Sequence, residues 1–227
     1  MAKILELPDS ARENLAGQIS EQLRRNEKIG MFGDDAGGSL DEEKEKPPLV
    51  EVGQEYFEVY SLEVLDPTRL KEAGGDLTTF VTLAHSLHHP VTFAGGGKGF
   101  ALTNVVEGEE WGPLSGFFES SIASNIDRAV ELAQNNKDIS NTANARLLLA
   151  PVHQVTALWF CKDDDCTGET QLLIVSAPDS DTVSSAVNQT QLRFGQVISS
   201  ADFLRALAAS GPTSGFNPTE RISRSSK

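Results

Sequence analysis

Two apolar runs near the middle of the chain, VTALWFC (155–161) and TQLLIVSA (170–177), are the densest in the sequence. A short acidic connection that contains a glycine separates them, which is typical of neighbouring strands joined by a hairpin. In the first run, apolar residues fall on both faces of the predicted strand, so both faces are expected to be buried. We therefore predict a central strand pair here, with Trp159 in the core.

An amphipathic helix is predicted near the N-terminus. Ser10 and Glu13 have the spacing of a capping box, and Leu15, Ile19 and Leu23 follow at four-residue intervals among polar residues. The apolar stripe is narrow, so the helix needs a groove, either on its own domain or on another chain. Both alternatives stay open, and the three stripe residues are candidate partner-binding residues.

The next segment, residues 30–48, is rich in glycine and acidic residues and has few apolar ones. Such a composition cannot offset the entropy of ordering, so we predict a flexible acidic linker. The chain then divides into an N-terminal helix (1–29), this linker (30–48), one globular domain (49–211) and a disordered tail (212–227). A tethered helix is an arrangement suited to capturing a partner.

Within the globular part, strands are predicted over 49–65, with a break at Gly53, and over 192–198. Apolar residues at helical spacing predict a helix over 77–87, ending before Pro90, and a second helix from about Leu114 to Asn135. A short third helix follows Ser199. This order indicates an α+β fold with a mainly antiparallel sheet covered by helices.

The formal net charge of −14 argues against a nucleic-acid partner, because phosphate contacts need lysine and arginine. No apolar run approaches the length of a membrane span, and residues 1–30 lack the apolar core of a secretion signal. Two cysteines do not make a disulfide framework. We therefore expect a soluble cytoplasmic protein with free thiols and no membrane partner.

The histidines and cysteines are candidate metal or redox residues. His85 and His89 lie four apart on the predicted helix, a spacing that places two ligands on one face. The pattern lacks the acidic residue of the zinc-protease motif, so capping and surface roles compete with it. Cys161 and Cys166 bracket four residues of the predicted hairpin, where they can face each other and oxidise to a disulfide.

A glycine-rich stretch, Gly95, Gly96, Gly97 and Lys98, is a candidate anion-binding loop, because bare backbone amides and a lysine suit a phosphate. Its spacing fits neither the Walker pattern nor the dinucleotide pattern, and a hairpin turn between two strands is the simpler interpretation. Further along, Trp111 stands in an acidic loop, where it packs on the domain or anchors a partner.

No catalytic constellation and no cofactor are predicted. The sequence favours a non-enzymatic protein-interaction or adaptor module, which recruits a protein partner or self-associates through its N-terminal helix and domain surface. The alternative is a small enzyme, or a metal or redox sensor, that uses His85, His89, Cys161 and Cys166.

Overall fold

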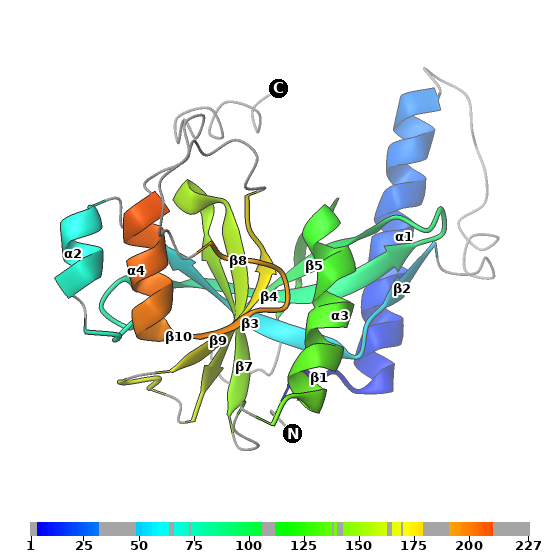
Figure 1. The fold of residues 1–227 in the computed structure, drawn as a ribbon. Helices are drawn as coiled ribbons and strands as arrows, with labels where there is room; N and C mark the ends of the chain where they lie inside the picture. Colours follow the sequence, from blue (N-terminus) through cyan, green and yellow to red (C-terminus); the bar gives the residue numbers. More distant parts are fainter. Residues whose placement is uncertain are drawn as a thin grey trace. The chain divides into compact units, whose positions relative to one another are not determined.

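The computed structural model describes residues 4–31, 49–63, 66–72, 74–105, 112–137, 139, 143–162, 165–168, 170–178 and 191–210 (Figure 1). Within these residues the protein is mixed α/β, with four α-helices and a large, mostly antiparallel sheet. The predicted fold class is confirmed at this level. None of the described helices is both long and apolar enough to cross a membrane.

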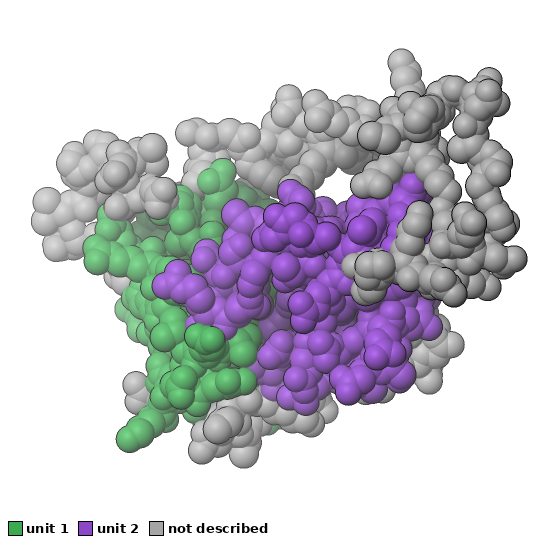
Figure 2. Space-filling model, turned by 90° about the vertical axis from the view of Figure 1, so that its right-hand side faces the viewer, with its two compact units in different colours: residues 1–3, 60–84, 129–227 green, residues 4–59, 85–128 purple. Residues whose placement is uncertain are grey.

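The chain forms two compact units, which Figure 2 shows in different colours. Unit 1 comprises residues 1–3, 60–84 and 129–227, and unit 2 comprises residues 4–59 and 85–128. The division falls within β3 (Glu55–Leu62), β4 (Val81–Phe93) and α3 (Ser121–Asn135), so these elements contribute to both units. The four segments predicted from the sequence stay a prediction.

Unit 1 is built on the predicted central hairpin, and its strands follow the order β10-β9-β8-β7 with antiparallel neighbours. Its elements are α2 (Pro67–Glu72), β7 (Asn144–Ala150), a 3-10 turn η1 (Pro151–His153), β8 (Val155–Cys161), β9 (Gln171–Ser176), β10 (Val197–Ser199) and α4 (Ser200–Ser210). Every residue of β8 is buried, which confirms that it is a central strand.

The core of unit 1 surrounds Trp159, which is 1% exposed. Its indole Nε1–H donates to Thr170 Oγ1 at 2.7 Å, and the Tyr60 ring meets it edge-on with centroids 5.4 Å apart. Leucines and Phe203 from α2 and α4 join the same buried cluster. A tryptophan with a satisfied N–H and aromatic neighbours is a strong packing anchor.

Unit 2 contains β1 (Leu5–Glu6), α1 (Asp9–Met31), β2 (Val50–Val52), β5 (Lys98–Asn104) and β6 (Leu114–Glu119), together with its parts of β3, β4 and α3. Strand β4 pairs with β2 and β5, β5 pairs with β6, and β1 pairs with β3, each time antiparallel. The predicted break at Gly53 separates β2 from β3, as expected.

Helix α1 confirms the predicted N-terminal helix and extends it to Met31, so the first residues of the predicted linker are helical. The helix begins after Pro8, whose carbonyl accepts hydrogen bonds from the N–H groups of Ala11 and Arg12 at 3.0 Å. Residues 32–48, the rest of the predicted linker, lie outside the described residues, as does the predicted tail, 212–227.

The helix predicted over 77–87 is wrong, because β4 runs through most of it and continues past Pro90. The predicted spacing of apolar residues is real, but one of them, Val81, is β-branched and threonines stand between the others, and β-branched side chains favour strands over helices. Pro90 keeps one bond on the side of β4 that faces β2, because its carbonyl accepts a hydrogen bond from Gly53 N–H at 2.7 Å.

The helix predicted from Leu114 is wrong in its first part, because residues 114–119 form strand β6 and α3 begins only at Ser121. The Ser120 hydroxyl accepts a hydrogen bond from Ile122 N–H at 3.3 Å, the bonding of a helix N-cap. Apolar periodicity inside α3 is as predicted, with Ile126 and Ala129 buried.

Candidate functional site

The glycine-rich segment is a tight turn between β4 and β5, as the simpler interpretation predicted. Phe93 N–H donates to the Gly97 carbonyl, and Gly96 N–H donates to the Phe93 carbonyl, both at 2.8 Å. Gly96 has φ +81°, a conformation that a residue with a Cβ rarely adopts. The Gly96 amide is therefore bonded within the turn.

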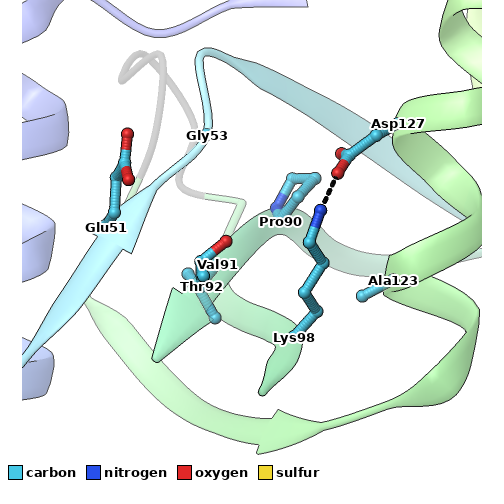
Figure 3. A pocket seen from close by; sticks show the side chains of 8 residues that line it. All are labelled: Glu51, Gly53, Pro90, Val91, Thr92, Lys98, Ala123 and Asp127. Carbon is cyan, nitrogen blue, oxygen red and sulfur yellow. Dashed lines mark hydrogen bonds and ion pairs between the residues drawn. The ribbon is translucent and has the colours of Figure 1, made fainter. Parts of the chain in front are cut away.

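Beside this turn, unit 2 has a pocket of about 150 Å³ (Figure 3). Its lining residues come from β2, β4, β5, α3 and the bend after β2: Glu51, Gly53, Pro90, Val91, Thr92, Lys98, Ala123 and Asp127. The Lys98 ammonium group points across the pocket and forms an ion pair with the Asp127 carboxylate. The lysine charge is thus already balanced, and anion binding by Gly95, Gly96, Gly97 and Lys98 stays a prediction.

Two adjacent histidines of β4 point to opposite faces of the strand. His89 is fully buried, with its ring stacked on Tyr56 at 5.6 Å and its Nε2 atom 2.9 Å from Thr103 Oγ1. His88 lies against the rings of Phe100 and Phe118, at centroid distances of 5.4 and 6.3 Å. Both Nδ1 atoms are buried without a hydrogen-bond partner among the described residues.

Burial lowers the pKa of His88 from 6.5 to about 4, and burial together with the nearby His88 lowers the pKa of His89 to about 4. The imidazoles are therefore neutral at pH 7, and the unfolded chain binds protons below about pH 6.5 that the folded chain does not. Stability from these two residues is present above pH 6.5 and is lost as the pH falls towards 4.

We therefore expect the free energy of unfolding, measured with urea, to fall by about 2 kcal/mol for each of the two histidines between pH 7 and pH 4.5. In His89→Gln the loss over this pH range should be smaller than in the wild type. His85→Gln is the matched control, because it replaces a histidine of the same strand whose side chain is exposed. Equal slopes in all three proteins would show that the buried histidines do not control the acid sensitivity.

The predicted metal residues are not assembled as the sequence suggested. His85 and His89 lie on strand β4 rather than on a helix, and His85 has φ 51°. Cys161 and Cys166 belong to unit 1 and are bonded to each other, with Cα atoms 4.9 Å apart. Among the residues that the structure describes, no group of three or more His, Cys, Asp or Glu side chains could hold a metal ion.

The disulfide confirms that the two cysteines meet, whereas the sequence led us to expect free thiols. Their geometry also differs from the predicted facing pair of strand residues. Strand β8 ends at Cys161, but β9 begins only at Gln171, so Cys166 stands in the connection, with φ 52°. The hairpin loop is longer than four residues, and the disulfide closes its first half.

The apolar stripe of α1 packs on unit 2 itself. Leu15 is 7% exposed, Ile19 is fully buried, and Leu23 is half-buried against the same cluster as Val50 and Leu87. Between Asp9 and Asn26, the exposed positions are mostly polar. The exposed side of the docked helix is therefore polar over these residues. Partner binding by Leu15, Ile19 and Leu23 stays a prediction.

Strand β6 ends the strand order of unit 2, and in the described part of the chain it pairs with β5 alone. None of its residues is buried, and Phe118 is 42% exposed. Sequence reasoning missed this strand because it assigned the segment to a helix; the adjacent Phe117 and Phe118 after Gly116 were the signal for a strand. Trp111, the other candidate surface aromatic, lies outside the described residues.

Comparison with known proteins adds no family to this picture. No protein-family model matches the chain, and neither a curated protein nor a solved structure is significantly similar to it.

Proposed function

We propose that this protein is a non-enzymatic interaction or adaptor module, which recruits a protein partner or a second copy of itself through unit 2. The observation that carries the proposal is the edge of β6, where an exposed aromatic side chain stands beside backbone groups that no described strand pairs. A strand edge of this kind is a template for an extended segment of another chain.

Helix α1 is the second part of the proposal. We propose that the chain between Met31 and Leu49 tethers it, that it covers one side of the sheet in the resting protein, and that Leu15, Ile19 and Leu23 meet a partner when the helix leaves unit 2. Because Leu15 and Ile19 are buried at rest, a partner has to compete with the helix's own contacts.

An affinity-capture experiment tests this function with the full chain as bait. Phe118→Asp should lose proteins that the wild type retains, because a charge at the edge opposes strand addition. Leu132→Asp is the matched control, since Leu132 has the same 42% exposure but lies on α3. Identical captured sets with all three baits would contradict an interaction through β6.

A redox sensor is the second candidate, favoured by one observation in unit 1. The guanidinium group of Arg146 contacts Cys166 Sγ and lies 5.2 Å from the centre of the Tyr60 ring. A cation beside a sulfur stabilises its thiolate, which speeds thiol exchange near neutral pH. After reduction, Cys166 of the wild type should be alkylated faster at pH 7 than Cys166 of the Arg146→Met variant. Equal alkylation rates in the two proteins would contradict the redox-sensor candidate.

A further inference from the structure

The backbone of β6 presents a defined pattern of unpaired groups. Ser120 N–H donates to the Lys98 carbonyl at 2.9 Å, and Gly99 faces Glu119 in the register. Backbone groups of alternate strand residues point to opposite edges, so those of Phe118 and Ser120 point to β5. The backbone N–H and C=O groups of Phe117 and Glu119 therefore point away from β5, and they pair with no described strand.

The charge around this edge indicates what kind of strand fits it. Strands β4, β5 and β6 carry only two formally charged side chains, Lys98 and Glu119, although the chain has a net charge of −14. Lys98 is already paired with Asp127. A basic partner would find one carboxylate here, whereas a neutral, aromatic strand fits a surface poor in charge, as the cores of protein interfaces are.

We propose that the occupant of this edge is a second copy of the same strand, paired antiparallel about a two-fold axis at Phe118. This inference rests on the proposed function and names its partner. Matching the faces of the two sheets requires each residue to stand opposite one that points to the same face. With the axis at Phe118, Phe117 of each copy stands opposite Glu119 of the other, and both outward-pointing residues form hydrogen-bonded pairs.

The same register explains the exposed aromatic ring. Phe118 faces its own copy in a non-hydrogen-bonded pair, where Cα atoms approach to about 4.5 Å and side chains are closest. Glu119 stands opposite Phe117 of the second copy rather than opposite another carboxylate. Because the two chains each carry a net charge of −14, added salt should strengthen the pairing by screening their repulsion.

Sedimentation velocity over a range of concentrations tests the dimer. The wild type should show a monomer–dimer equilibrium that salt shifts towards the dimer. Glu119→Pro removes an outward N–H without touching a bond to β5 and should weaken dimerisation about tenfold or more. Glu119→Ala is the matched control, since it keeps the N–H, and it should dimerise at least as well as the wild type.

Cysteine cross-linking tests the register. Phe118→Cys should oxidise to a disulfide-linked dimer whose peptide map joins residue 118 to residue 118, because the proposed pairing brings these positions together. Leu132→Cys is the matched control, with equal exposure in the wild type. Cross-linking of Phe118→Cys no faster than that of Leu132→Cys would overturn the proposed register.

The outcomes separate this inference from the proposed function. If the wild type is monomeric at every protein and salt concentration, a second copy is not the occupant of this edge. If Phe118→Asp nevertheless loses a captured protein that Leu132→Asp retains, the edge of β6 still serves as an interaction surface for a different chain. If neither dimerisation nor capture depends on β6, both proposals fail.

Discussion

Replacing Trp159 with alanine should lower the free energy of unfolding by ~3–5 kcal/mol, the usual cost of deleting a large buried aromatic side chain. The side chain is 1% exposed and lies in a strand whose residues are all buried, so the cavity cannot be filled by a surface rearrangement. The substitution also leaves the Thr170 hydroxyl without its indole donor.

Chemical denaturation of the wild type and Trp159→Ala measures this loss. Trp159→Phe is the conservative control: it keeps an aromatic ring beside Tyr60 but lacks the N–H, so its loss should be smaller. A denaturation midpoint for Trp159→Ala equal to that of the wild type would place this side chain at the surface and contradict the central position of β8.

The double substitution Leu15→Asp with Ile19→Asp should destabilise unit 2 by more than ~4 kcal/mol, because it removes two buried apolar side chains and puts two charges in their place. A helix that hung from a tether without docking on unit 2 would leave the melting temperature nearly unchanged. Burial of Leu15 and Ile19 among the strands of unit 2 reverses that expectation.

Thermal melting with a matched control tests this effect. Gln18→Asp with Gln22→Asp places the same charges four residues apart on the exposed side of α1, and it should lower the melting temperature only slightly. Equal melting temperatures for the wild type and both variants would mean that α1 does not hold unit 2 together and is free for another chain.

The hairpin of unit 1 and helix α1 were predictable because their patterns are unambiguous. Strand β8 is apolar on both faces, and α1 has apolar residues every four positions, although it begins at Asp9 and not after a Ser10 cap. Strand β4 was not predictable in the same way, since the apolar residues from Leu77 to Leu87 follow a helical period, whereas a strand places Ala84 and Leu87 on opposite faces. Hairpin pairing with β5 over Ser86–Thr92 stabilises the strand, and the apolar period of the segment alone does not reveal this pairing.

The candidate site was predicted only in part. The turn at Gly96 was expected, whereas the ion pair between Lys98 and Asp127 joins residues far apart in sequence. The edge of β6 was missed because its six residues precede a true helix and were merged with it. The N-cap at Ser120 could have been predicted from the sequence, since serine is a preferred N-cap residue.

Amide hydrogen exchange of β6 tests most directly the claim that this edge is an interaction surface. In dilute protein the amides of Phe117 and Glu119 should exchange quickly, while the amide of Ser120, bonded to Lys98, should be protected. As the protein concentration rises, Phe117 and Glu119 should become protected together. Protection of both at every dilution, or of neither at any concentration, would contradict an edge that is open in the monomer and covered by a second chain.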